Sequence, residues 1–590
     1  MFLARKIGTQ TTKLFHLSRP IMTRNVSLRI TTHNRVPLPD KVQIQLTEPE
    51  DHICTLLDEC TNWMKETGDT YTSCRIAGGW VRDKLLGSPC NDIDIALEDM
   101  MGMPFAQKFV EFCSSVKHIH VDKIAKIESN PDRSKHLETA RTSILGIELD
   151  FVNLRSEEYA EDSRIPHQIA FGTPLEDALR RDLTINSLFY NIHTRSVEDH
   201  TNKGLEDLRE GIIRTPLPPK ETFMDDPLRV LRCVRFASRF GFDLADELAV
   251  SARDPEIQEA LCYKISRERV GEELDKMMQG RDPLRAIQII HDLSLYFSIF
   301  HIPSSVAPEL SAPLAADNVA LAACSILHFL TQPPSLTSPT LPPLHPLLSN
   351  SISHNKLVAA RLYLACALFP FHGVTYQDSK ARPRLAAEAA IRESLKLGTQ
   401  NHYLDGIPAL FFAVDVLKNP KVDPVASSAE RRIIGLLLRD RYVHNHNTGS
   451  FWATSLLFSL VSELVPLWNA QLDELDVDRA AERINAYNAF VSRAVELDLP
   501  STVDAKPILD GREVVRIVGA SSPGRWTGDV LARVIEWQLE FPEGSKDQCE
   551  EWLRSEVAAG KIVVPPVEVN GKRHKQPDSQ TKKKKKVDSE

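Results

Sequence analysis

Several features that define common classes of protein are missing from this sequence of 590 residues. No apolar run approaches the roughly 18 residues that a helix needs to span a bilayer, so we expect a soluble protein with no membrane segment. The ten cysteines are scattered from Cys54 to Cys549, without a CxxC pair or a cluster with histidine at metal spacing. This pattern predicts neither a zinc site nor a disulfide framework, and it indicates reduced thiols inside a cell.

Acidic residues are absent from residues 1–39, which contain Lys and Arg among Ser, Thr and apolar residues. This composition is typical of a mitochondrial transit peptide, and a plain disordered terminus is the alternative. Met22 lies inside the segment and could start a shorter product. The expected location is therefore mitochondrial together with nuclear or cytoplasmic.

Charge elsewhere is mixed, with 26% charged residues and a net charge of −9. Binding to nucleic acid would therefore have to come from local basic faces. The last segment, residues 561–590, contains two clusters of Lys, Arg and His. We expect it to be a disordered tail, and nuclear import, RNA contact and simple solvation remain open for it.

The first motif with a chemical interpretation is a glycine pair, Gly78 and Gly79, followed thirteen positions later by Asp92 and Asp94. A glycine pair lets the backbone approach a phosphate where a β-carbon would obstruct it. Side chains alternate along a strand, so both carboxylates project from one face. Two neighbouring carboxylates repel each other unless a cation lies between them, and Mg²⁺ suits such a site.

Asp150 can supply a third acid, because residues 148–154 form a second alternating strand. A pair of aspartates separated by one residue is by itself more typical of a turn or a solvated strand edge. The glycine pair ahead of it and the second acidic strand behind it favour a metal site instead. The sequence therefore predicts a metal-dependent nucleotidyl transfer.

A second constellation lies in the helical part of the chain, at Asp226, Arg229, Arg232 and Arg235. Residues three apart share one helix face. Cytosine and adenine both present an amine donor beside a ring-nitrogen acceptor, so a carboxylate next to an arginine matches them and rejects uracil and guanine. The simpler interpretation is a helix start, with Asp226 as the cap before Pro227 and the arginines as a solvated stripe.

The predicted fold class is α+β, with a mixed sheet in the first domain followed by an all-helical remainder. A Pro- and Ser-rich stretch interrupts the helical part and is expected to be a loop or linker. The expected divisions are a targeting segment at 1–39, a mixed helix and strand domain at 40–160, a helical region at 161–300, the loop at 301–350, a second helical region at 351–560, and the basic tail at 561–590.

These motifs resemble those of class II tRNA nucleotidyltransferases, the CCA-adding enzymes, of the eukaryotic, fungal type. The resemblance runs in order over residues 70–280 and returns at 508–514 and 523–531. Its parts are residues 75–96, residues 134–140 with 148–155, residues 171–191, residues 204–219, the Asp226 to Arg235 helix, and residues 267–276.

The resemblance implies a polymerase β-like head at 40–160, a neck at 161–300, and a body and tail at 351–560 that bind tRNA. It also implies transfer of CMP, CMP and AMP from CTP and ATP to the 3′ end of tRNA. It implies that Asp92 and Asp94 bind Mg²⁺ and that Asp150 helps to polarise the 3′-hydroxyl. The remaining roles concern the nucleotide. Gly78, Gly79 and Arg82 would contact the triphosphate, Arg181 with Asp182 and Asn186 would contact its phosphate or ribose, and Asp226 and Arg229, supported by Arg232 and Arg235, would select the base.

Two alternatives remain at this point. One is a poly(A) polymerase or a partial enzyme that adds only CC or only A, whose motifs are nearly identical. The other is a catalytically inactive tRNA-binding protein on the same fold, against which the three intact aspartates argue. The sequence leaves open the oligomeric state and the residues that hold tRNA, for which the basic side chains Arg431, Arg432, Arg439 and Arg441 are candidates.

Overall fold

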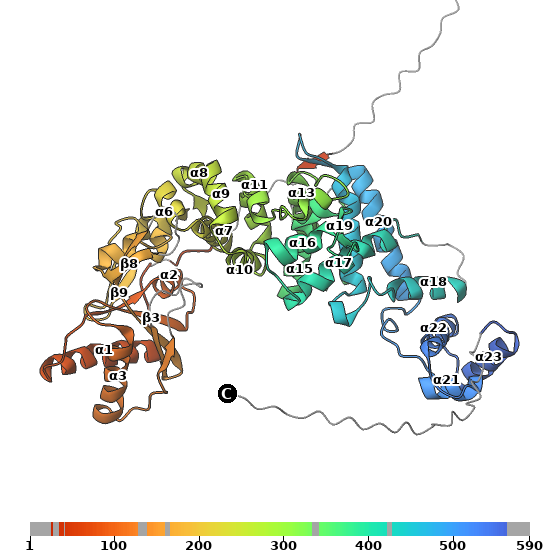
Figure 1. Cartoon of the computed structure of the whole chain (residues 1–590), viewed down its shortest axis with the longest axis horizontal. Helices are drawn as coiled ribbons and strands as arrows, with labels where there is room; N and C mark the ends of the chain where they lie inside the picture. Colours follow the sequence, from red (N-terminus) through yellow and green to blue (C-terminus); the bar gives the residue numbers. More distant parts are fainter. Residues whose placement is uncertain are drawn as a thin grey trace, which may run out of the picture. The chain divides into compact units, whose positions relative to one another are not determined.

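The computed structural model describes residues 25–27, 35–39, 42–127, 139–159, 166–332, 341–353, 355–421 and 428–562. The chain divides into two compact units, Met1–Lys421 with Arg441–Val491 and Val422–Asp440 with Ser492–Glu590. The first unit contains the head sheet and most of the helices (Figure 1). No helix in the described part of the chain is long and apolar enough to cross a membrane.

The head is built on a seven-stranded sheet of order β10-β9-β2-β3-β6-β5-β4. Only the central pair β3 and β6 is parallel, and every other neighbouring pair is antiparallel. The strands are β2 (Cys74–Ala77), β3 (Asp92–Leu97), β4 (Ala125–Ile127), β5 (Thr139–Ile144), β6 (Ile147–Asn153), β9 (Phe189–Asn191) and β10 (Ser196–Glu198).

Three helices accompany the sheet: α1 (Glu48–Glu66), α2 (Gly79–Leu85) and α3 (Gly102–Glu111). Helix α1 begins with a capping box in which Thr47 and Glu50 satisfy each other's backbone N–H groups. Helix α3 contacts α1 and packs against β5 and β6 (Figure 1). The buried Phe105, Phe109 and Phe151 rings meet there and hold β6 in place.

The helical region after the head begins beyond a hairpin of β7 (Arg155–Tyr159) and β8 (Pro166–Phe171). Its helices are α4 (Pro174–Leu179), α5 (Gly204–Glu210), α6 (Pro219–Asp225), α7 (Leu228–Phe240), α8 (Asp246–Ala252), α9 (Pro255–Tyr263), α10 (Arg267–Met278), α11 (Pro283–Asp292) and α12 (Tyr296–Ile299). Helix α7 packs on α10 and α11 and is central to this region.

The rest of the first unit is a helical body that also carries short strands. Its helices are α13 (Asn318–Thr331), α14 (Pro346–Ser353), α15 (Lys356–Ala367), α16 (Ala386–Ala389), α17 (Tyr403–Leu417), α19 (Trp452–Leu464) and α20 (Val477–Glu496), whose last turn belongs to the second unit. The short strands of the body are β13 (Thr375–Gln377), β14 (Pro383–Leu385), β15 (Trp468–Asn469) and β16 (Glu474–Asp476), and a parallel pair of short strands, β11 (Ile212–Ile213) and β12 (Asp243–Leu244), lies in the preceding helical region beside α5 and α7.

Two expected divisions of the chain differ from the structure. The head sheet continues past residue 160, because β9 pairs with β2 and β10 pairs with β9. The segment 301–350 contains α13, which lies in the body core with Cys324 and Leu327 fully buried. Residues 318–331 contain no proline and are largely apolar, so they form a helix although proline is frequent on either side.

At the N-terminus, residues expected to be disordered contribute to the first unit. Asn25–Ser27 form strand β1, which pairs with β16 and so uses the backbone groups of that strand's free edge. Arg35 donates hydrogen bonds to the carbonyl oxygens of Glu210 at 2.7 Å and Leu208 at 3.2 Å. Residues 1–24 and 28–34 of the expected targeting segment and residues 563–590 of the basic tail lie outside the described residues.

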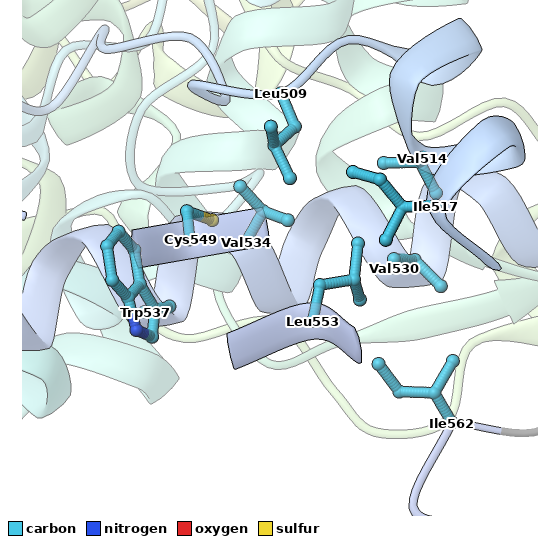
Figure 2. Packing of buried hydrophobic residues seen from close by; sticks show 9 residues of the cluster. All are labelled: Leu509, Val514, Ile517, Val530, Val534, Trp537, Cys549, Leu553 and Ile562. Carbon is cyan, nitrogen blue, oxygen red and sulfur yellow. The ribbon is translucent and has the colours of Figure 1, made fainter. Parts of the chain in front are cut away.

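The second unit has its own hydrophobic core, formed by α21 (Gly511–Val518), α22 (Arg525–Glu540) and α23 (Lys546–Ala558), and α18 (Ser428–Leu438) packs on α22. Figure 2 shows side chains of α21, α22 and α23 pointing toward one another, among them Val514, Val534 and Leu553, which are fully buried. The apolar positions recur at helical spacing in each segment, which is why three short helices can share one core.

Candidate active site

The two aspartates of the first motif lie on β3, as the alternation predicted. Asp92 and Asp94 are exposed, while Ile93 and Ile95 between and after them are buried. In the parallel register of β3 and β6, Asp94 stands opposite Asp150. The fold therefore brings all three acids to neighbouring positions on two central strands.

The carboxyl group of Asp94 has a raised pKa. Its side chain is accessible from a pocket, but the protein packs closely around the carboxyl group, and this desolvation raises its pKa to about 6. Arg181 opposes the rise, whereas Asp92 and Asp150 add to it. A divalent cation would relieve this repulsion, so the donor set fits a metal.

Asp150 is oriented differently from what the sequence suggested. Its carboxylate forms a two-point ion pair with Arg141 on β5, with Nε and Oδ1 2.7 Å apart and Nη2 bonded to Oδ2. Among the described residues, the three acids do not form a group whose ligand atoms all lie within 4.8 Å of one another. Asp150 is thus near the other two acids, but Arg141 neutralises it.

The glycine pair forms the tight turn between β2 and α2. Gly78 has a φ of +71°, and a β-carbon there would lie 2.7 Å from Nη1 of Arg181. The positive φ favours glycine, and a β-carbon would in addition displace the end of the Arg181 side chain. Helix α2 then starts at Gly79 and turns Arg82 inward.

Arg82 is buried and joins the head to α7. Its guanidinium lies 4.9 Å from the centre of the Phe236 ring and 5.0 Å from that of Phe240. It donates to Asp83 at 2.8 Å and to the side-chain oxygen of Asn186. Burial lowers the pKa of this arginine, with the charge of Asp83 opposing, and the group stays charged at any physiological pH.

Asp182 and Asn186 extend this chain of polar contacts to α7. Asn186 donates to Asp182 at 2.9 Å, and Arg232 donates to the other oxygen of Asp182 at 2.6 Å. Burial would raise the pKa of Asp182, but the charge of Arg232 and these hydrogen bonds lower it to about 2. The side chains of α2, the Asp182–Asn186 segment and α7 are therefore held in one network.

Arg181 does not pair with its neighbour Asp182. It binds Asp177 instead, with Nε 3.0 Å from Oδ2, and donates to the backbone oxygen of Asn186 at 3.2 Å. Asp177 is almost fully buried and also holds Arg180. This carboxylate, which the sequence did not single out, orients two arginines of the segment 171–191.

The base-selecting residues that the sequence proposed lie at the start of α7. Asp226 precedes the helix and accepts from the backbone N–H of Leu228 at 3.2 Å, which resembles the expected cap. Its carboxylate also forms a two-point pair with Arg269 of α10, at 2.7 and 3.3 Å. Arg229 is 8% exposed and donates to the backbone oxygen of Arg180 at 2.7 Å.

Most of these side chains line one cavity of about 570 Å³. Seven arginines and three aspartates contribute to its wall, an excess of four positive charges. The lining includes Gly78, Gly79, Arg82, Asp94, Arg155, Arg180, Arg181, Asp182, Asn186, Asp226, Arg229, Arg232, Phe236 and Arg269. Such a cavity suits a polyanion with a flat polar group attached.

Three predicted residues are not in that lining. Asp92 and Asp150 lie beside Asp94 on the sheet, and Arg235 is turned away to Glu273, with Nε 2.5 Å from Oε2. Arg235 also stacks on Phe236 at 4.1 Å. Arg235 therefore holds α7 against α10. The sequence had instead predicted that it lies next to the nucleotide.

Comparison with known proteins agrees with the interpretation of this site. A family model described as the poly A polymerase head domain matches residues 74–214. The chain is 36% identical over 542 residues to the mitochondrial CCA tRNA nucleotidyltransferase of Saccharomyces cerevisiae, covering 87% of this chain and 94% of that protein. The chain belongs to the CCA tRNA nucleotidyltransferase family. The resemblance inferred from the motifs is thereby confirmed.

Other members of the family agree. A tRNA nucleotidyltransferase of Schizosaccharomyces pombe is 32% identical over 510 residues, covering 85% of this chain and 95% of that protein. The CCA-adding enzyme of Bacillus stearothermophilus, solved in complex with CTP, superposes with a TM-score of 0.53 at 18% identity, over 88% of this chain and 99% of that one. That likeness confirms the predicted α+β head followed by helices. Membership of this polymerase-type family implies use of a divalent metal.

The candidate tRNA-binding arginines of the second unit are engaged within the protein. Arg431 donates to the carbonyl oxygens of Leu497 at 2.9 Å and Leu539 at 2.7 Å. Arg439 donates to three carbonyl oxygens of residues 502–505. These two side chains close turns of their own unit. Arg432 is partly exposed beside Glu536 and Glu540, and Arg441 is exposed, so these two stay candidates for tRNA contact.

Proposed function

We propose that this chain adds C, C and A in turn to the 3′ end of tRNA, using CTP and ATP, releasing pyrophosphate and using no nucleic-acid template. The observation that carries the proposal is the single cavity that holds Asp94, an excess of arginines and the Asp226 and Arg229 pair. A triphosphate matches the positive wall, and a base matches the carboxylate beside a guanidinium.

Mg²⁺ is the metal that we propose, held by Asp92 and Asp94. Bound there, it would neutralise the triphosphate and favour in-line attack by the 3′-hydroxyl. Gly78 and Gly79 leave room for phosphate oxygens, and Arg181 lies beside the turn that they form. If Asp150 polarises the primer hydroxyl, its carboxylate must bind that hydroxyl and Arg141 at the same time. The ion pair with Arg141 therefore restrains the position of the Asp150 carboxylate.

Base selection is assigned to Asp226 and Arg229, with Arg269 as the residue that positions Asp226. Each carboxylate oxygen has two acceptor directions. Arg269 and the backbone N–H of Leu228 use both on Oδ1, and Arg269 uses one on Oδ2, which leaves the other direction of Oδ2 for an exocyclic amine. Arg229 is held by the carbonyl oxygen of Arg180 and keeps further N–H groups for the ring nitrogen. Cytosine and adenine satisfy this pair, whereas uracil and guanine place donors and acceptors in the wrong order.

A mitochondrial location is supported by the name of the Saccharomyces cerevisiae relative and by the composition of residues 1–39. We propose that a second product begins at Met22 and works in the nucleus or cytoplasm. Tagging products that begin at Met1 and at Met22 separately, and locating each in cells, tests this directly. Identical distributions of the two products would contradict it.

The activity is tested with tRNA that ends at its discriminator base, incubated with Mg²⁺ and CTP, ATP or both, followed by sequencing of the products. We expect CC with CTP alone and CCA with both. Long A tracts would favour a poly(A) polymerase, and products that stop at CC or gain only A would favour a partial enzyme.

Asp92→Ala should lose at least about 1000-fold in kcat, whereas Asp69→Ala, an exposed aspartate of the same head, should stay near wild type.

The base-selecting role is tested with misincorporation of UTP and GTP. Asp226→Ala should lower the discrimination against both by about 10- to 100-fold, because one buried pair of hydrogen bonds is lost. Arg269→Gln should lower discrimination less and raise the KM for CTP, and Arg269→Lys should restore part of it. Selectivity that survives Asp226→Ala would mean that this residue serves only as a helix cap.

A further inference from the structure

A second, larger cavity of about 940 Å³ lies in the same unit and shares no lining residue with the nucleotide cavity. Its wall comes from the ends of α7, α10 and α13 and the beginnings of α11 and α15. Nothing in the proposed chemistry of nucleotidyl transfer uses it.

Helix α7 connects the two cavities. Arg229, Arg232 and Phe236 face the nucleotide cavity, and Arg239 and Phe240 face the second one. These residues are three or four positions apart, so they form one stripe along the helix. At about 1.5 Å per residue, Arg239 lies about 15 Å from Arg229, which is roughly the length of four nucleotides in a stacked strand.

The second cavity has a positive rim. Arg281 and Lys356 are exposed, and neither forms an ion pair or side-chain hydrogen bond with the residues that the structure describes. Arg239 forms an ion pair with Asp83 at 3.1 Å, and its side chain is still 44% exposed. The only carboxylate in the lining is Asp282, which accepts from the backbone N–H of Arg285 at the start of α11. Phosphate groups would be attracted to this rim.

Gln288 lies inside the same cavity and is 7% exposed. Its side-chain oxygen is buried and has no hydrogen-bond partner among the described residues. Leaving a buried acceptor unpaired costs about 1–3 kcal/mol, so a ligand that donates a hydrogen bond there would recover this energy. Phosphate alone offers no donor, whereas a ribose 2′-hydroxyl does.

We propose that this second cavity binds the ribose-phosphate backbone of the tRNA acceptor strand, a few nucleotides before the reacting 3′ end. Arg239, Arg281 and Lys356 contact phosphates, and Gln288 accepts a hydrogen bond from a 2′-hydroxyl. The inference rests on the proposed function, since it requires the primer to be RNA that enters the nucleotide cavity along α7.

The phosphate contacts are tested with the double variant Arg281→Glu and Lys356→Glu. We expect the KM for tRNA to rise at least 10-fold and the salt dependence of tRNA binding to weaken by a slope of about 1 to 2. The affinity for CTP and kcat at saturating tRNA should not change. Lys380→Glu, an exposed cation in the turn between β13 and β14, is the matched control and should leave the KM within 2-fold.

The hydrogen bond of Gln288 is tested with acceptor-stem minihelices that carry single 2′-deoxy substitutions. The wild-type protein should bind one of them about 5-fold more weakly than the all-ribose form, and Gln288→Leu should bind both equally. Circular dichroism and the melting temperature establish that this near-isosteric variant is folded.

The two proposals fail in different ways. If the wild-type protein does not add CCA, the proposed function is overturned. If CCA is added but the double variant keeps the wild-type KM for tRNA, or loses affinity for free CTP as much as for tRNA, the strand site is overturned. Equal binding of every minihelix by the wild-type protein would overturn the role of Gln288.

Discussion

The single residue whose charge most disfavours the folded state at the active site is Asp94. Its pKa is raised from 3.8 to about 6, first by desolvation and then by Asp92 and Asp150. Between these two pH values the folded protein binds more protons than the unfolded chain, so stability falls as pH rises through this window. Above pH 6 the ionised carboxylate destabilises the metal-free protein, which is the cost of a site prepared for a cation.

Asp94→Asn should therefore stabilise the metal-free protein. At pH 7.5 we expect the melting temperature to rise by about 1–3 °C, and this gain should shrink as the pH falls toward 4, where the wild-type carboxyl is also uncharged. Mg²⁺ should stabilise the wild type and have little effect on the variant. Thermal unfolding at several pH values measures both. Asp69→Asn serves as control, and a gain that is independent of pH would contradict the electrostatic cause.

Residues whose chemistry depends on local spacing could be predicted from the sequence. The glycine pair, the alternation of Asp92 and Asp94, and the positions of Asp226 and Arg229 are all recorded in short stretches of chain. The partners of these residues could not be predicted, because Arg141 meets Asp150 through the register of β5 and β6 and Arg269 meets Asp226 through the packing of α10 on α7. Arg269 nevertheless lies inside a motif that the resemblance had picked out, residues 267–276.

At the level of elements, the turn between β2 and α2 controls how closely the backbone can approach Arg181. Gly78 combines a positive φ with a β-carbon position only 2.7 Å from that guanidinium. Gly87, at the other end of α2, also has a positive φ of +70° but has no atom within 4 Å of its β-carbon position. The two glycines therefore separate backbone strain from displacement of Arg181.

Gly78→Ala should destabilise the protein by about 1–3 kcal/mol through backbone strain and should also weaken CTP binding at least 10-fold, because Arg181 must move. Gly87→Ala should incur similar strain but keep the CTP affinity within about 2-fold. Chemical denaturation and CTP titration measure the two effects. Equal losses of CTP affinity in both variants would mean that strain alone, transmitted through α2, disturbs the site.

Element boundaries can be predicted where the apolar spacing is regular, as in α1, whose buried residues include Ile53, Leu57 and Met64. Element boundaries could not be predicted where pairing with a distant part of the chain determines them. Strands β9 and β10 are only three residues long and follow a helical pattern, yet the free edge of β2 recruits them into the head sheet. In the same way, α13 is buried by its neighbours α11 and α15, which a count of prolines in the surrounding segment does not reveal.

At the scale of the whole molecule, the proposed active site lies in the first unit, and the second unit has a hydrophobic core of its own. Every residue of the nucleotide cavity belongs to the first unit. The core of the second unit uses none of the side chains proposed for catalysis, so its stability can be changed without touching the active site. Its proposed contribution is to hold tRNA, as expected for residues 351–560.

Leu553→Ala tests this separation. Leu553 is fully buried in the second unit, so its truncation should destabilise that unit by about 2–5 kcal/mol. Calorimetry should show one unfolding transition moving to lower temperature while the other stays in place. CTP affinity should remain that of the wild type, and tRNA affinity should fall once the second unit begins to unfold. Ile433→Ala, at a 62% exposed aliphatic position of the same unit, is the control. A parallel loss of CTP binding would show that the two units fold as one.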